Sequence, residues 1–337
     1  MSARILRGEA GVYESVEELR RGGVVGVPTE TVYGLAGNAF DPMALVKIFE
    51  SKGRPLSDPL IVHLPEAGWL ERVVRFSSLE QQNLVARLAA SFWPGPLTLL
   101  LPRHPDLPEL VTAGSDLVAV RVTAHPLFQQ VIRGVDSPLA APSANRFGSI
   151  SPTSSEDVRI ELGEFIGLIL EGGPCDHGVE STIVSLENQA MSILRPGPIT
   201  EDQLIEFGHI DTFGTPVNTP GSLPGHYAPK KDLQILNTDI KSCVIRPNAG
   251  YLAFTEASEE IRSRFSKVEI LSPSGDLREA AANFYGALRR LDSSNVDIIY
   301  TTSLPEIGIG VAIMDRMRRA SYGSRHKTTH PSVKCNE

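Results

Sequence analysis

The chain has 337 residues, of which 41% are hydrophobic and 21% charged, a composition typical of a soluble globular protein with about two domains. Its 40 acidic residues outnumber its 32 basic residues, and the formal charge of -8 argues against a broad nucleic-acid-binding or membrane-binding face. The cysteines Cys175, Cys243 and Cys335 form neither a disulfide framework nor a CxxC metal motif, which fits a reducing compartment. Because the sequence also has no apolar leader and no apolar run of membrane-spanning length, we expect a cytoplasmic protein.

Residues 1–208 alternate short apolar runs with helical patterns, which predicts an α/β or α+β domain with a sizeable mixed sheet. A helix should begin at Asp41 and Pro42, because Asp is a favoured N-cap and Pro suits the first turn. Another helix should cover Ser78–Ser91. The expected strands are Gly23–Val27, Leu60–Leu64, Leu97–Leu101, Leu117–Val122, Phe165–Leu170 and Thr182–Leu186.

Residues 209–231 are rich in proline and glycine and lack periodicity, as is typical of a linker. Residues 232–325 then predict a small α/β domain. Its strands should lie at Tyr251–Phe254, Val268–Leu271 and Val296–Tyr300, and the apolar stripe from Leu277 to Leu291 indicates a helix. We expect the polar tail 326–337 to be disordered.

A short basic run is the first candidate for a binding site. Lys52 and Arg54 are two residues apart, so in an extended segment both side chains would leave one face and could hold adjacent phosphates. Pro55 should end the preceding helix and leave both cations on a loop. Taken alone, this tripeptide is more simply explained as an ordinary solvated loop.

Other polar residues occur at the ends of strands or inside them. The run from Thr29 to Thr31 follows a strand, where hydroxyl groups often face a ligand crevice, although a capped turn would also explain it. His63 ends an apolar strand, where a satisfied core histidine is the simpler explanation. Arg121 lies among alternating valines, so it must be paired or must face a cleft, on the opposite side of the strand from those valines.

In combination, the motifs are specific. The chain contains, in order, PTETVYGL, KGRP, DPLIVH, WPGPLT, AVRV, APSAN, SPT, GVESTI, LRPG and HYAP, and near its end GIGVAIMDRMRRAS. This series resembles the long, two-domain form of the threonylcarbamoyl-AMP synthase family, the YrdC-like enzymes. The resemblance implies a YrdC-like twisted mixed sheet with a concave basic pocket, plus a smaller Rossmann-like α/β C-terminal domain.

The resemblance also implies a reaction, in which L-threonine, bicarbonate and ATP give threonylcarbamoyl-AMP and pyrophosphate. Other proteins then transfer the threonylcarbamoyl group to tRNA, so the enzyme itself needs no stable nucleic-acid binding. Mg²⁺ is expected to arrive with ATP, with no dedicated protein metal site. Lys52 and Arg54 match the family's KxR motif and should bind the triphosphate and stabilise charge during catalysis.

The remaining site residues follow by the same resemblance. On the ATP side the candidates are Asp58, Leu117, Ser143, Asn145, Ser151, Arg195, His226 and Tyr227. On the threonine side they are Thr31, His63, Arg121, Ala141 and Ser181, with Arg121 suited to a carboxylate. The linker, which carries His226 and Tyr227, should act as a lid over the site.

The chain departs from the family pattern at two places. Many members have Arg-x-Pro where this chain has Arg121-Val122-Thr123, and many have basic residues before HYAP where this chain has Gly221–Gly225. Two rival functions are a non-catalytic tRNA- or nucleotide-binding module and a carbamoyltransferase component. The acidic net charge counts against the first, and the lack of a CxxC motif counts against the second.

Overall fold

The computed structural model describes residues 2–187, 190–211, 219–221, 225–236 and 238–325, and the predicted disordered tail lies outside them. The chain forms two compact units. The first unit consists of residues 1–147 and 152–222, and the second of residues 148–151 and 223–337. The sequence did not indicate that the short segment 148–151 joins the second unit.

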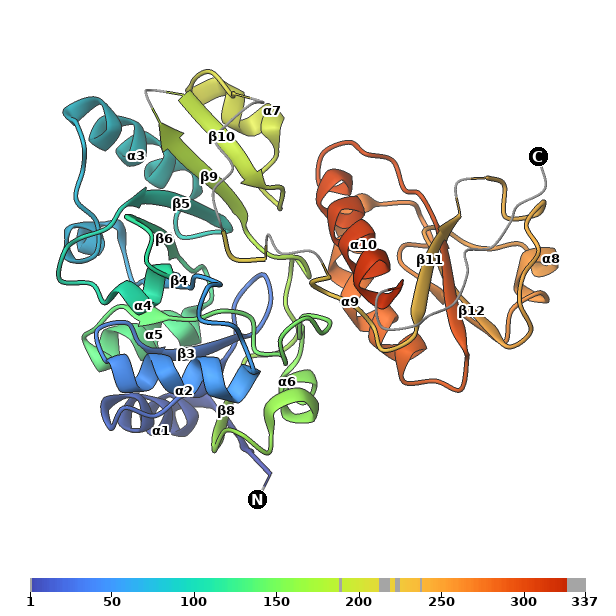
Figure 1. Ribbon diagram of the computed structural model, residues 1–337, viewed down its shortest axis with the longest axis horizontal. Helices are drawn as coiled ribbons and strands as arrows, with labels where there is room; N and C mark the ends of the chain where they lie inside the picture. Colours follow the sequence, from blue (N-terminus) through green and yellow to red (C-terminus); the bar gives the residue numbers. More distant parts are fainter. Residues whose placement is uncertain (1, 188–189, 212–218, 222–224, 237, 326–337) are drawn as a thin grey trace. The chain divides into compact units, whose positions relative to one another are not determined.

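The first unit is built on a large mixed sheet, which among the described residues has ten strands in the order β1-β8-β2-β3-β7-β4-β6-β5-β9-β10 (Figure 1). The sheet contains parallel pairs, such as β4 with β6, and antiparallel pairs, such as β5 with β6. The strands are β1 (Arg4–Arg7), β2 (Val25–Val27), β3 (Gly34–Asn38), β4 (Ile61–Leu64), β5 (Leu97–Pro102), β6 (Leu117–Val122), β7 (Leu139–Ala140), β8 (Leu168–Glu171), β9 (Thr182–Glu187) and β10 (Ala190–Arg195).

Helices cover this sheet and bury two main apolar clusters against it. One cluster includes Leu45 and Ile48 of α2, and the other includes Phe128 and Val131 of α5. The helices are α1 (Gly8–Arg20), α2 (Pro42–Lys52), α3 (Leu79–Phe92), α4 (Glu109–Thr112), α5 (Pro126–Val135), α6 (Ser155–Leu162) and α7 (Glu201–Leu204), with 3-10 turns η1 (Ala67–Arg72) and η2 (Ile205–Phe207).

Helix α2 places the basic run. Its start is as predicted, because the Asp41 carboxylate accepts a hydrogen bond from the Met43 N–H at 2.9 Å and Pro42 occupies the first turn. Its end differs from the expectation that both cations lie on a loop after the helix. Lys52 is the last helical residue, Gly53 turns the chain with a left-handed φ of 62°, and Arg54 follows. Both cations are buried, so the solvated-loop interpretation is wrong.

The second unit is a small parallel α/β fold, as predicted. Among its described residues, four strands are arranged in the order β11-β14-β12-β13. The strands are β11 (Asp232–Leu236), β12 (Ala249–Ala253), β13 (Lys267–Ile270) and β14 (Ile298–Thr302), and the helices are α8 (Glu259–Arg262), α9 (Leu277–Asp292) and α10 (Gly310–Arg325). Within the described part of the chain, no helix combines the length and the apolar character needed to cross a membrane.

Candidate active site

Arg121 is the centre of the predicted threonine side. It lies on β6 directly across from His63 of β4, and its side chain is only 3% exposed. The guanidinium forms an ion pair with Glu30 at 2.6 Å and donates hydrogen bonds to Thr31 Oγ1 at 3.0 Å and to the Gly95 carbonyl at 3.1 Å. The sequence-based requirement that this charge be paired is therefore confirmed, and Glu30 is the partner that the sequence did not identify.

Glu30 is buried and fully ionised. Burial raises the pKa of its carboxyl group, but the charge of Arg121 and hydrogen bonds from Arg121, Thr123 and the Ala124 backbone lower the pKa to about 2. The Thr123 hydroxyl donates to Glu30 at 2.7 Å. Thr123 occupies the position of the proline in the Arg-x-Pro pattern. In this chain, the residue at that position therefore donates a hydrogen bond to the Glu30 carboxylate.

His63 supplies a neutral ring to the same cluster. Burial and the nearby Arg121 charge lower its pKa to about 3, so the imidazole is uncharged near neutral pH. A hydrogen bond with the Ala141 backbone opposes that shift and links two predicted threonine-side residues. Among the described residues, His63 Nδ1 is buried and has no hydrogen-bond partner. A neutral, unpaired ring nitrogen can hydrogen-bond a polar ligand.

The hydrogen-bond direction at Thr31 can be deduced from its neighbour. The Thr29 hydroxyl donates its only hydrogen to the Val32 carbonyl at 2.6 Å. Thr31 must therefore be the donor in the 2.9 Å contact between the Thr29 and Thr31 hydroxyls. Because Thr31 also accepts from Arg121, its oxygen can offer a ligand only a lone pair, so it suits an amino or hydroxyl group of the substrate.

Ser181 connects the two sides of the predicted site. Its hydroxyl pairs with Thr98 at 2.8 Å and accepts a hydrogen bond from Arg195 Nη2 at 3.0 Å. Arg195 also donates to the Ser181 carbonyl at 3.0 Å and to the Pro220 carbonyl at 2.9 Å. The linker residue Pro220 is thus in direct contact with a residue predicted to bind the nucleotide.

The predicted phosphate-binding cations surround a buried carboxylate. Arg54 pairs with Asp58 at 3.0 Å and donates to the Pro59 carbonyl at 2.7 Å. Burial raises the pKa of the Asp58 carboxyl group, whereas the charges of Arg54, Lys52 and Arg195 oppose that rise. The positive charges from α2, its following loop and β10 are therefore close together around Asp58.

Lys52 connects the SxN segment, residues 143–145, to the end of α2. Its ammonium group donates to the Ser143 carbonyl at 2.5 Å and to the Asn145 carbonyl at 2.6 Å. Burial, followed by repulsion from Arg54, holds the pKa of Lys52 well below its usual value. An anionic ligand beside Lys52 favours the charged ammonium form, which has three N–H donors, so the two protein bonds leave one donor for that ligand.

The other predicted ATP-side residues fall in both units. On the face of β6 that carries Arg121, Leu117 packs with Ile61, Ala119 and Leu194 in a small apolar cluster. Ser151, His226 and Tyr227 belong to the second unit. There Tyr227 has a left-handed φ of 67° and packs near Tyr285, with ring centroids 5.9 Å apart.

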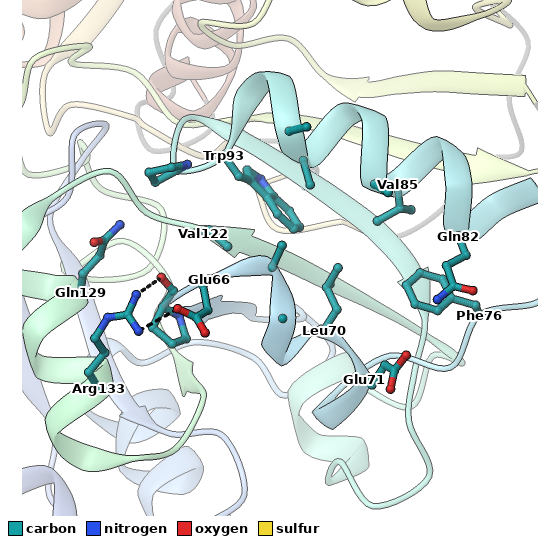
Figure 2. Close-up of a pocket in the computed structure, with 17 residues that line it drawn as sticks. Glu66, Leu70, Glu71, Phe76, Gln82, Val85, Trp93, Val122, Gln129 and Arg133 are labelled. Carbon is teal, nitrogen blue, oxygen red and sulfur yellow. Dashed lines mark hydrogen bonds and ion pairs between the residues drawn. The ribbon is translucent and has the colours of Figure 1, made fainter. Parts of the chain in front are cut away.

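A separate groove of about 600 Å³ lies elsewhere on the first unit, between η1, α3 and α5 (Figure 2). Figure 2 shows Trp93 and Leu70 in its wall and the ion-paired Glu66 and Arg133 at one end. The groove also contains Val122, whose side chain lies on the opposite face of β6 from Arg121. None of the predicted site residues lines this groove.

The motif resemblance agrees with comparisons of the whole chain. Residues 17–197 match the family model Sua5_yciO_yrdC, described as "Telomere recombination", and residues 199–321 match "Threonylcarbamoyl-AMP synthase, C-terminal domain". The threonylcarbamoyl-AMP synthase of Bacillus subtilis is 38% identical over 320 residues, 90% of this chain and 91% of that protein. The chain belongs to the threonylcarbamoyl-AMP synthase family.

Further relatives of the synthase family support the assignment. The threonylcarbamoyl-AMP synthase of Pyrococcus abyssi is 36% identical over 316 residues, 90% of this chain and 92% of that protein. The crystal structure of P. abyssi Sua5 complexed with L-threonine is 33% identical, with a TM-score of 0.83 over 96% of this chain and 98% of that chain. This match confirms the expected fold, a mixed α/β sheet with a smaller C-terminal domain.

The sequence reasoning missed several residues of the cluster. Glu30 lies within the PTET motif, and its position between two threonines at a strand end was the available signal. Thr98 and Gly95 lie in the WPGPLT motif, but nothing local indicates that they contact Ser181 and Arg121.

Proposed function

We propose that this protein is an L-threonylcarbamoyladenylate synthase, a nucleotidyltransferase that converts L-threonine, bicarbonate and ATP to threonylcarbamoyl-AMP and pyrophosphate. One observation carries the proposal. Ser181, a predicted threonine-side residue, accepts a hydrogen bond from Arg195, one of the three cations around Asp58, in a chain that matches its relatives across 90% of its length. A site that joins an amino-acid side to a phosphate side suits this condensation.

The threonine side binds and orients the amino acid. The Arg121 guanidinium binds the carboxylate of L-threonine, and the Thr31 oxygen and neutral His63 accept hydrogen bonds from its amino and hydroxyl groups. An uncharged His63 adds no positive charge beside the amino group, which must itself be neutral to react with carbon dioxide or bicarbonate. The product of that step is a carbamate; water leaves when bicarbonate reacts, and the amine releases a proton when carbon dioxide reacts.

The phosphate side carries out adenylate formation by positioning and charge stabilisation. A carbamate oxygen attacks the α-phosphorus of ATP, the bond to the β-phosphate oxygen breaks, and pyrophosphate leaves. Lys52 and Arg54 neutralise charge on the phosphoryl oxygens, while Ser143, Asn145 and Arg195 position the nucleotide. No covalent enzyme intermediate is needed.

Magnesium enters the proposal as part of the nucleotide. The described residues contain no group of three metal-binding side chains, and Asp58 lies among three cations that disfavour a divalent ion. The ion would therefore be held by triphosphate oxygens and water, where it supplies charge neutralisation.

We also propose the wider setting. The product supplies other proteins with the threonylcarbamoyl group for tRNA modification, and the linker closes over the bound nucleotide. The contact of Pro220 with Arg195 supports a linker near the site. The buried thiol of Cys175, which forms no disulfide among the described residues, supports a reducing, cytoplasmic setting.

Pyrophosphate release by the purified protein tests the function. With ATP and Mg²⁺, release should require both L-threonine and bicarbonate. Arg54→Ala should abolish it, whereas Arg133→Ala, which removes the exposed pair with Glu66 and a hydrogen bond to the Pro65 carbonyl, should not. Nucleotide binding without threonine-dependent release would instead support the rival binding module.

A further inference from the structure

Arg121 owes its orientation to contacts from separate parts of the first unit. Glu30 and Thr31 follow β2, and Gly95 lies in the turn between α3 and β5. A guanidinium has five N–H donors in one plane, so these contacts determine both the direction of that plane and which donors remain for a ligand.

Glu30 is itself held independently of Arg121. Its carboxylate accepts hydrogen bonds from the Thr123 hydroxyl and the Ala124 backbone, and its carbonyl accepts from the His177 N–H at 2.9 Å. The Glu30 side chain is 5% exposed. A residue whose carboxylate is held by Thr123 and Ala124 and whose backbone is held by His177 provides a rigid reference point for the more flexible arginine.

We propose that Glu30, held by Thr123, is a positioning residue that orients Arg121 for bidentate binding of the threonine carboxylate. This inference rests on the proposed function. Bidentate recognition needs the guanidinium plane to match the carboxylate plane, so a small rotation weakens both bonds. A direct role as general base is disfavoured, because a carboxyl group with a pKa of about 2 is a poor proton acceptor near neutral pH.

Glu30→Gln tests the proposal, because glutamine keeps the shape but loses the charge that attracts Arg121. The matched control is Glu66→Gln, which removes a carboxylate from the exposed Glu66–Arg133 pair in the same unit. Glu30→Gln should raise KM for L-threonine about 10- to 100-fold and leave KM for ATP within about twofold. The preference for L-threonine over its methyl ester should fall by a similar factor, because the ester lacks the carboxylate.

A second pair of variants, at Thr123, tests the proposal even if Glu30→Gln does not fold. Thr123→Val keeps both charges and removes one donor to Glu30, so it should weaken L-threonine binding about 3- to 10-fold, and Thr123→Ser should restore it. Calorimetric titration with L-threonine measures this without turnover. Wild-type affinity in both Glu30→Gln and Thr123→Val would overturn the proposal. Absence of threonine-dependent pyrophosphate release in the wild type would instead refute the proposed synthase function. The calorimetric titrations with L-threonine would still decide the role of Glu30.

Discussion

The Glu30–Arg121 pair should make the stability of the first unit depend on pH. The folded-state pKa of Glu30 is about 2, against an ordinary value of 4.5. At about 1.4 kcal/mol per pKa unit, ionised Glu30 contributes roughly 3 kcal/mol to the free energy of unfolding. Because the folded pKa is the lower one, the contribution is complete above about pH 5 and is lost as the pH falls toward 2.

Glu30→Gln removes this contribution and leaves Arg121 buried without its counter-charge. The free energy of unfolding at pH 7 should therefore fall by about 3 to 5 kcal/mol. Toward pH 3 the wild type loses about half of the Glu30 contribution. The difference in free energy of unfolding between the wild type and Glu30→Gln should therefore narrow by about 1 to 2 kcal/mol. Urea titrations followed by tryptophan fluorescence suit this test, since Trp69 and Trp93 both lie in the first unit. A difference in unfolding free energy between wild type and variant of less than about 1 kcal/mol at pH 7, or one that stays constant below pH 4.5, would show that the Glu30–Arg121 pair does not stabilise the first unit in this way.

Three other predictions concern single side chains. Lys52→Met removes the ammonium group between the SxN carbonyls and should lower kcat for pyrophosphate release about 100-fold or more; a rate within threefold of the wild type would contradict its role. Thr31→Val removes the oxygen beside Arg121 and should raise KM for L-threonine about tenfold, with Thr31→Ser recovering most of the loss; equal KM values would rule out a contact with the substrate. Tyr227→Ala removes a buried ring from the second unit and should destabilise that unit by about 3 kcal/mol; calorimetric melting unchanged from the wild type would show that Tyr227 does not anchor the fold.

The strands that could be predicted are those with continuous apolar runs, such as β5, β6 and β9, and the helices with clear caps, such as α2. Strand β3 was missed because its sequence, GLAGN, has the glycines and asparagine of a turn. The structure explains Gly37, because a Cβ there would lie 3.0 Å from Ile48 Cδ1 of α2. Strand β7 has only two residues, too few for any period to show.

The chemistry of the site was easier to predict than its geometry. A charge among valines requires a partner, but Glu30 is 91 residues away from Arg121, and only the fold brings them together. The orientation of Lys52 could not be predicted either, because it depends on the helix ending at that residue and on carbonyl groups 91 and 93 residues further along the chain.

The most direct test of the central claim is mass spectrometry of the reaction product. The purified protein would be incubated with ATP, Mg²⁺, L-threonine and ¹³C-labelled bicarbonate. The proposed reaction should yield threonylcarbamoyl-AMP that carries one heavy carbon, formed together with pyrophosphate and absent when threonine is omitted. AMP or ADP without a labelled adenylate would contradict the assignment of this site to threonylcarbamoyl-AMP synthesis.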